Sequence, residues 1–399
     1  MRLLSSTLDR VAPSATVALT GRVAALKAEG RDVIGLGAGE PDFPTPEHIR
    51  EAGKRAIDEG RTRYTAVGGV PELIDAVRAK FGRDNDLAYG ASEVMVCAGG
   101  KQVLYNALMA TLDEGDEVVI PAPYWVSYPD MTRLAGGMPV IVETIAPDYR
   151  MTPDQLESAI TDRTKWLILN SPGNPTGAGY DAEALGALAE VLMRHPRIRV
   201  ISDDIYEHIV FDGFRFATLA QVEPRLKDRV LTVNGVSKAY AMTGWRIGYA
   251  GGPAELIGAM RKIQSQSTTN PCSISQWAAV EALEGPQDFL APNAAMFQRR
   301  RDMVVDALNG CPGIDCPTPE GAFYVYPSIH GCIGKTSAGG RLIADDSGFA
   351  EALLEEEGVA VVHGAAFGAS PAFRVSYAAA DEVLKEAMAR IARFSGGLN

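Results

Sequence analysis

A single lysine, Lys238, stands in the stretch VNGVSKAYAMTGWRIGY, where apolar segments flank it on both sides. Lysine is costly to bury, and it rarely stands beside apolar strands without a chemical task. Its amine can attack a carbonyl carbon and form an imine. Arg246, a short turn further along, can bind a phosphate or a carboxylate. Taken alone, Lys238 is better explained as a surface residue between two strands, so its chemistry depends on what the rest of the chain brings to it.

Other loops of the chain supply the groups that such a lysine would need. They offer a carboxylate, a phenol, an amide, an aromatic ring, a hydroxyl and glycine amides at the start of a helix. Together with the lysine and the arginine, these groups are the parts needed to hold a phosphorylated pyridine aldehyde as a Schiff base. The residues concerned are Gly99, Gly100, Lys101, Trp125, Asn174, Asp203, Tyr206 and Ser237.

The elements that must position these residues form a long alternation of strands and helices. This alternation predicts an α/β fold with a mostly parallel sheet covered by helices on both faces. Ligands bind beyond the carboxyl ends of the strands in such sheets, and the residues named above follow strand ends. The predicted strands are apolar runs at residues 93–97, 117–120, 139–143, 166–169, 198–201, 230–233 and 245–250.

After residue 284 the pattern changes and predicts a smaller α+β domain. An extended arm over residues 1–13 and an amphipathic helix over 15–29 are expected to join it, with Val17, Val23, Ala24 and Leu26 as candidate buried positions. The predicted division is a large domain at 46–285 and a small domain made of 1–45 and 286–399. The small domain is built from predicted helices at 286–309, 346–357 and 381–394 and strands at 322–326, 359–362 and 373–376.

The composition excludes several classes of function. The chain has 38 Lys and Arg against 50 Asp and Glu, a net charge of -12, which disfavours binding to nucleic acid or to an anionic membrane. No apolar stretch is long enough to cross a bilayer, and the first residues lack the apolar core of a cleaved signal. Five scattered cysteines indicate free thiols in a reducing cytoplasm. The histidines lack metal-ligand spacing, so no metal is predicted.

Nine motifs follow one another over essentially the whole chain: AGEPDFPTP, TRYTAVGG, GGKQ, PAPYWVSYPDM, NSPGNPTG, SDDIYEH, NGVSKAYAMTGWRIGY, PEGAFYVYP and FRVSYA. In this combination and order they resemble the class I aminotransferases of the pyridoxal-phosphate fold type I superfamily. The likeness is greatest to the bacterial aspartate/prephenate aminotransferase branch, subgroup 1β. The resemblance implies a seven-stranded, mostly parallel sheet domain between layers of helices, a smaller α+β domain, and pyridoxal 5'-phosphate as the cofactor.

The resemblance also implies roles at the cofactor ring. Lys238 would be the Schiff-base lysine and the base that moves the substrate α-proton. Asp203 would pair with the ring nitrogen, Tyr206 and Asn174 would contact the ring oxygen, and Trp125 would stack on the ring. Two neighbours compete for these roles, Asp204 with Asp203 and Tyr124 with Trp125. We favour Asp203, because Asp203 and Tyr206 keep the spacing of the family.

The phosphate and the subunit arrangement follow from the same resemblance. Tyr64 would reach the phosphate of the partner subunit, which implies a homodimer with active sites at the subunit interface. The phosphate of the same subunit would be bound by Gly100, Lys101, Ser237 and Arg246.

For the substrate, the resemblance implies that Arg374 forks onto the α-carboxylate, helped by Asn174 and the backbone of Gly37. The expected reaction is ping-pong transamination between an L-amino acid, aspartate first, and 2-oxoglutarate or oxaloacetate. An aromatic or prephenate aminotransferase and a carbon–sulfur β-lyase remain alternatives. They remain because Ala12 stands where the acidic-substrate branch commonly has lysine, and no arginine stands near residues 265–268 to bind a second carboxylate. Lys101 is the remaining candidate for that carboxylate.

Overall fold

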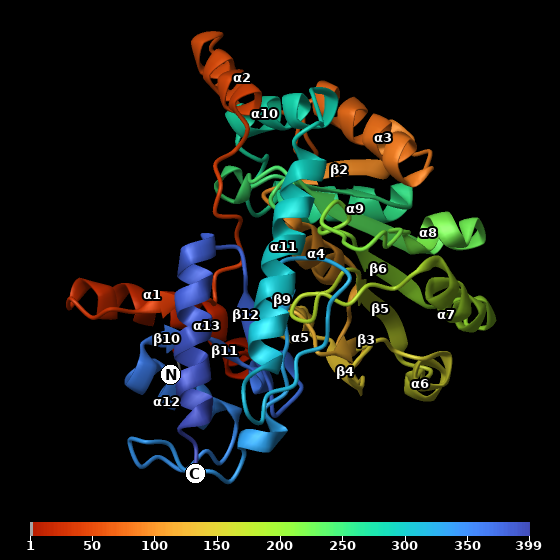
Figure 1. Ribbon diagram of the computed structural model, residues 1–399. Coiled ribbons are helices and arrows are strands. Elements are labelled where there is room, and N and C mark those ends of the chain that lie inside the picture. Colours follow the sequence, from red (N-terminus) through yellow and green to blue (C-terminus); the bar gives the residue numbers. More distant parts are fainter. Residues whose placement is uncertain (1–2) are drawn as a thin grey trace.

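The computed structural model describes residues 3–399. The strand β8 (Gly248–Gly251) of the central sheet runs antiparallel to both of its neighbours, and the other four neighbouring pairs are parallel. The predicted fold class, a mostly parallel seven-stranded sheet between helices with a smaller α+β part, is confirmed. The strand order in this sheet is β2 (Val94–Cys97), β8 (Gly248–Gly251), β7 (Val230–Gly235), β6 (Arg199–Asp203), β5 (Thr164–Asn170), β3 (Glu117–Ala122) and β4 (Met138–Glu143) (Figure 1).

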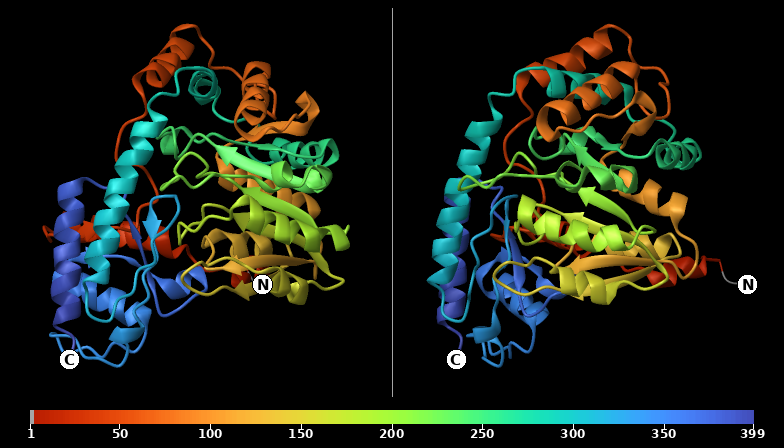
Figure 2. Two further views of the ribbon diagram at one scale, coloured as in Figure 1. Left: turned by 45° about the vertical axis from the view of Figure 1, so that its right-hand side comes forward. Right: turned by 90° about the vertical axis from the view of Figure 1, so that its right-hand side faces the viewer.

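Helices cover both faces of this sheet, because successive side chains of a strand point to opposite sides (Figure 2). In β2, Val94 and Val96 belong to one buried cluster, whereas Met95 and Cys97 belong to another on the opposite face. The first cluster includes residues of α2 (Glu47–Asp58), α3 (Pro71–Asn85), α6 (Pro153–Ala159), α7 (Ala182–Arg194), α8 (Leu219–Val222) and α10 (Ser273–Glu284). The second includes residues of α4 (Gly100–Thr111), α5 (Ser127–Leu134) and α9 (Ala254–Ser265).

A second part of the molecule combines the two ends of the chain. β1 (Ile34–Gly35) pairs in parallel with β10 (Val359–Ala360), although 325 residues separate Ile34 from Val359. Around these strands lie a sheet in the order β11 (Val362–His363), β12 (Phe373–Ser376), β9 (Tyr324–Val325) and the helices α1 (Ala15–Ala28), α11 (Leu290–Asn309), α12 (Asp346–Glu357) and α13 (Asp381–Gly396). Because the N-terminal segment pairs with the C-terminal one, we propose a large domain at 46–285 and a small domain at 1–45 plus 286–399.

Several predicted details are wrong. α1 has no buried residue: Val17 is 69% exposed and Ala24 is exposed, while Val23 and Leu26 are half-buried against a small cluster. Residues 6–10 of the predicted extended arm form a 3-10 helix, and residues 1–2 lie outside the described part.

The last predicted strand of the large domain, 245–250, starts later in the structure. β8 begins at Gly248, because Thr243–Trp245 forms a 3-10 turn that ends at Arg246 with a left-handed φ of 56°. The helices α9 and α10 are not among the predicted elements. Among residues 3–399, no helix combines the length and the apolar character needed to cross a membrane.

Gly248 marks a close approach that the candidate site depends on. It lies in β8 against the start of α4, and a Cβ at this position would stand 2.2 Å from the backbone nitrogen of Gly100. No real Cβ contact is that short, so a side chain here would push the first turn of α4 away from the sheet. The glycine therefore fixes where the N-terminus of α4 lies.

We expect Gly248→Ala to lower the free energy of unfolding by about 1–3 kcal/mol, because the backbone must shift to admit the methyl group. Gly258→Ala is the matched control: no atom lies within 4 Å of its added Cβ, and its place in α9 favours alanine. Denaturant unfolding of the two cofactor-free variants compares them. Equal stability of both variants would contradict the close-approach argument.

Candidate active site

A cavity of about 620 Å³ lies at the carboxyl edge of the large sheet and is lined on the other side by residues of α1, β9 and β12. All predicted site residues except Tyr64 line it. Tyr64 is 90% exposed and lies elsewhere on the surface. Trp125 lines the cavity, whereas its competitor Tyr124 does not. The lining includes Gly37, Gly100, Lys101, Trp125, Asn174, Asp203, Tyr206, Ser237, Lys238, Arg246 and Arg374.

Lys238 follows the end of β7 and is half-buried. Its Nζ donates a hydrogen bond of 2.6 Å to the carbonyl oxygen of Gly39. Burial, and then the nearby charges of Arg374 and Arg246, lower the pKa of Lys238 to about 8. A substantial fraction of this lysine is therefore the neutral amine at moderately alkaline pH, which is the form that attacks a carbonyl carbon.

Asp203 ends β6 and is only 6% exposed. Tyr128 donates a hydrogen bond of 2.7 Å from its hydroxyl to Oδ2 of this carboxylate. Burial raises the pKa of Asp203 to about 6, against the lowering effect of the Tyr128 hydrogen bond. Asp204, the competing residue, accepts a hydrogen bond from Ser202 instead and does not line the cavity. Of the two carboxylates, only Asp203 is in position to meet a positive charge in the cavity.

Arg374, on β12, is 2% exposed and crosses to the large domain. Its Nη1 donates to Oδ1 of Asn174 over 2.8 Å, and its Nη2 donates to the carbonyl oxygen of Gly37 over 2.6 Å. Its Nε is buried without a hydrogen-bond partner, and no ion pair with a carboxylate is formed within residues 3–399. Its guanidinium lies 4.6 Å from the ring centre of Tyr324. A buried cation without a counter-charge is suited to bind an anionic ligand.

A second anion site lies at the start of α4. Gly99 precedes the helix with a φ of 91°, and the first amide groups of a helix have no partner within it. A Cβ at Gly99 would stand 2.3 Å from Nη2 of Arg246, so the arginine lies directly over the glycine. Arg246 is fixed there by hydrogen bonds to the carbonyl oxygens of Thr243 and Ala98, at 3.0 and 3.3 Å. Amides, guanidinium and the nearby Ser237 hydroxyl suit a phosphate group.

Three further residues of the cavity wall are not among the predicted ones. Tyr128 binds Asp203 as described above, and the hydroxyl of Tyr324 lies 3.0 Å from that of Tyr206. Asn170 donates to the carbonyl oxygen of Asp203 over 2.7 Å and accepts from the backbone of Asn174 over 2.8 Å. Tyr128 stands one turn after Trp125, and this spacing is a signal that could have found it.

These groups fit pyridoxal phosphate. The amides and the guanidinium can bind the phosphate of this cofactor, and the buried carboxylate can pair with its protonated ring nitrogen. The amine of lowered pKa can react with its aldehyde. The Arg246 guanidinium lies directly over Gly99, so it and the first amides of α4 can bind the same phosphate group.

Comparison with known proteins agrees with this chemistry. The sequence profile of the family "Aminotransferase class I and II" matches residues 31–391. The chain belongs to this family. It is an aminotransferase that uses pyridoxal phosphate.

Individual relatives cover the full length. The chain is 66% identical to the aspartate/prephenate aminotransferase of Cereibacter sphaeroides, with 100% of each chain covered. It is 56% identical to an aspartate aminotransferase of Rhizobium meliloti, over 97% of this chain and 95% of that one. A crystal structure of the aspartate aminotransferase from Rhizobium meliloti superposes with a TM-score of 0.97, at 54% identity and full coverage of both chains. That of Thermus thermophilus with maleate gives 0.91, at 45% identity and with 98% and 100% covered.

Asp203 gives the cofactor-free protein a specific pH dependence. Its folded-state pKa of about 6 lies above the unfolded value near 4, so the stability it contributes below pH ~4 is lost as the pH rises through 6. We expect Asp203→Asn to be more stable than the unaltered chain above pH ~6, by up to about 3 kcal/mol, and to lose this advantage near pH 4. Unfolding at several pH values measures the difference.

Asp113→Asn is the matched control for this pH series, because the Asp113 side chain is 93% exposed. It removes one carboxylate without removing a buried charge, so its stability should follow that of the unaltered chain. A pH-independent effect of Asp203→Asn would show that the buried charge is not responsible.

Proposed function

We propose that this aminotransferase exchanges the amino group of L-aspartate with a 2-oxo acid, 2-oxoglutarate or oxaloacetate, in a ping-pong reaction. The observation that carries the proposal is the meeting of Lys238, Asp203 and Arg374 around one cavity, which brings together an amine, a carboxylate and a guanidinium whose Nε has no hydrogen-bond partner in the described part of the chain. The names of the full-length relatives support aspartate as the amino donor.

Pyridoxal phosphate, when bound, supplies an aldehyde and a pyridinium ring that accepts electrons from the α-carbon of the amino acid. In our proposal, Lys238 holds the cofactor aldehyde and, once free, takes the proton from the α-carbon. Asp203 keeps the ring nitrogen protonated. Tyr206 and Asn174 contact the ring oxygen, and Trp125 covers the ring.

The phosphate of the cofactor is assigned to the N-terminus of α4 and its surroundings. The amide of Gly100 and the side chains of Ser237 and Arg246 would bind it. Lys101 lies at the same end of the cavity, with Nζ 4.7 Å from the Trp125 ring centre, and burial together with Arg246 lowers its pKa. It is available either to this phosphate or to a distal carboxylate of the substrate.

For the substrate, Arg374 would bind the α-carboxylate, supported by Asn174 and the Gly37 carbonyl. A dicarboxylate donor would place its second carboxylate near Lys101. The Thermus thermophilus relative was crystallised with maleate, a four-carbon dicarboxylate, which supports this substrate class. Prephenate is the second candidate, because the relative at 66% identity is named an aspartate/prephenate aminotransferase.

We propose further that the active unit is a homodimer in the cytoplasm. Tyr64 is almost fully exposed in one subunit, and the N-terminal arm displays Leu3, Leu4 and Leu8 with at least half of their surface exposed. A partner subunit would cover such apolar groups and bring its Tyr64 to the phosphate. Five free cysteines, four of them buried, support a reducing compartment.

The covalent role of Lys238 is tested by reducing the loaded enzyme with borohydride and locating the cofactor by peptide mass. We expect the label on the peptide that contains Lys238 and none on the Lys238→Ala variant. Lys101→Gln, which alters the other lysine of the cavity, should still be labelled. Label on Lys238→Ala would refute the central assignment.

Substrate specificity is tested with aspartate, glutamate, phenylalanine and arogenate as donors. Arg374→Lys keeps the charge but loses the fork, and we expect kcat/KM to fall roughly 10²-fold for every donor. Lys101→Gln should lower kcat/KM about tenfold for the donors that carry a second carboxylate and leave it unchanged for phenylalanine. An equal loss with phenylalanine, or weaker cofactor binding, would assign Lys101 to the phosphate. Slow reaction of the unaltered enzyme with both acidic donors would overturn the choice of aspartate.

A further inference from the structure

A buried ion pair, Lys80 with Glu207, lies next to the cavity without lining it. Glu207 directly follows Tyr206, is 5% exposed and lies among residues of α3 and β7. Its carboxylate forms an ion pair with Lys80, which is fully buried. The same carboxylate accepts a hydrogen bond of 2.8 Å from Nδ2 of Asn85 on Oε2 and one of 2.8 Å from Nδ2 of Asn234 on Oε1.

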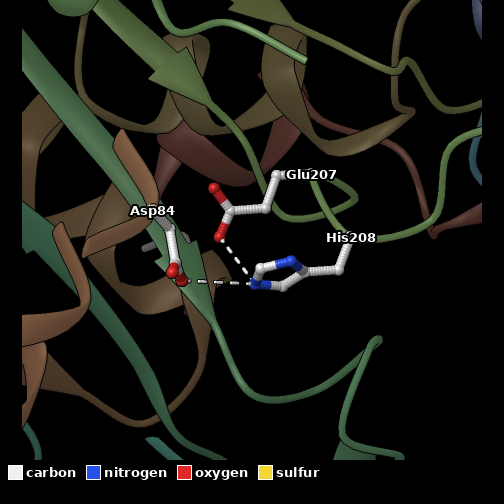
Figure 3. A group of neighbouring side chains, drawn as sticks. All are labelled: Asp84, Glu207 and His208. Carbon is white, nitrogen blue, oxygen red and sulfur yellow. Dashed lines mark ion pairs between the residues drawn. The ribbon is translucent and has the colours of Figure 1, made fainter. Parts of the chain in front are cut away.

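This cluster is not a metal site, although Asp84, Glu207 and His208 lie close enough together to surround an ion (Figure 3). The Lys80 ammonium already contacts Glu207, donates to Oδ1 of Asn85 over 2.7 Å and stands 3.8 Å from Asp84. A metal ion would meet this positive charge at close range. Burial lowers the pKa of His208, so the histidine adds no second charge at neutral pH.

Glu207 is ionised in this setting. Burial alone would raise its pKa, but the charge of Lys80 and the hydrogen bonds from Asn85 and Lys80 act against that effect, and the pKa lies below its usual value. An ionised carboxylate offers only acceptors, so it can bind the ammonium and both amide groups at once. The side-chain amide of a glutamine in its place carries an NH₂ group, which is itself a donor. It would face the Lys80 ammonium and the two asparagine amides, which are donors as well.

The position of this carboxylate matters because of where the backbone pairing stops. The ladder between β6 and β7 ends with the pair Asp203 and Val233. Beyond it, one strand continues into the turn that carries Tyr206, and the other continues through Asn234 toward Lys238. The bond between Asn234 and Glu207 is the next connection between the two segments. Asn234 also accepts from the backbone nitrogen of Gly235 over 2.7 Å.

We propose that Glu207 is a positioning residue that, through Asn234, fixes the Lys238 loop relative to the turn that carries Tyr206. The inference rests on the proposed roles of Tyr206 and Lys238 at the cofactor. The buried Lys80 anchors the carboxylate on α3 with or without the amide of Asn85, and Asn234 transmits its position to β7. The bond between Glu207 and Asn234 thereby sets the distance between the Lys238 amine and the Tyr206 phenol. It does so at a place where β6 and β7 are no longer paired with each other.

The test uses two variants that each remove one amide donor from the same carboxylate. Asn234→Ala cuts the connection to the Lys238 loop. Asn85→Ala is the matched control, because it removes a donor on the α3 side and also an acceptor of Lys80. Glu207→Gln is unsuitable, since it would leave the buried ammonium without its counter-charge. Each variant is measured for cofactor dissociation, for the pH midpoint of the visible cofactor band, for kcat, and for thermal unfolding without cofactor.

We expect Asn234→Ala to release the cofactor on the order of tenfold faster, to shift the pH midpoint of its visible band, and to lose kcat by up to about 10²-fold. Asn85→Ala should unfold at least as easily as Asn234→Ala but keep the pH midpoint and the cofactor release rate of the unaltered enzyme. If neither variant shifts the midpoint, the carboxylate serves stability alone; if both shift it equally, the effect does not pass through Asn234; either outcome overturns the inference. Failure of the proposed function shows separately, as label on Lys238→Ala.

Discussion

Two basic side chains, the half-buried Lys238 and the buried Arg374, are held in the cavity by carbonyl oxygens. Gly39 accepts from Lys238, while Gly37 and the side chain of Asn174 accept from Arg374. A carbonyl orients a cation without neutralising it. A carboxylate at either place would raise the pKa of Lys238 or satisfy Arg374, and a substrate anion would then have to compete with it. The rest of the fold has to keep carboxylates from pairing with Lys238 and Arg374. The nearby carboxylate of Asp203 accepts a hydrogen bond from Tyr128 instead.

The large sheet makes this separation possible. Its parallel strands end at one edge, so β6 and β7 deliver Asp203 and Lys238 side by side without ordering long loops. The antiparallel β8 starts at the same edge, and Arg246, just before it, lies over the start of α4, where Gly248 and Gly99 leave no room for side chains. The start of α4, Arg246 and Lys238 therefore share one frame, whereas Arg374 comes from β12, outside the large sheet.

The sequence predicts this frame well because each part has a local signal. The strands are apolar runs, and the glycines, Lys238 and Asp203 stand where the runs end. Contacts between distant segments leave no such trace: Tyr324 meets Tyr206 across the two domains, and Glu207 looks like one more charge in SDDIYEH, although it is buried against Lys80. The prediction that Val17 and Ala24 are buried is wrong for a different reason. Helical spacing indicates which face is apolar, but it does not say whether the same chain covers that face.

The carbonyl groups of Gly37 and Gly39 belong to a loop, so their positions need a support outside the large sheet. Arg300 on α11 supplies it. Its Nη1 and Nη2 bind both oxygens of Asp42 at 2.7 and 3.0 Å, and its Nε binds Asp381 at the start of α13 at 2.8 Å. Planar, two-pronged binding fixes direction as well as distance. Asp42 belongs to the loop segment and Asp381 to the C-terminal helix, so one guanidinium joins the N-terminal and C-terminal segments of the chain. The paired charges of Arg300 and its two carboxylates thus support the loop whose carbonyl oxygens hold Lys238 and Arg374, which have no carboxylate partner among residues 3–399.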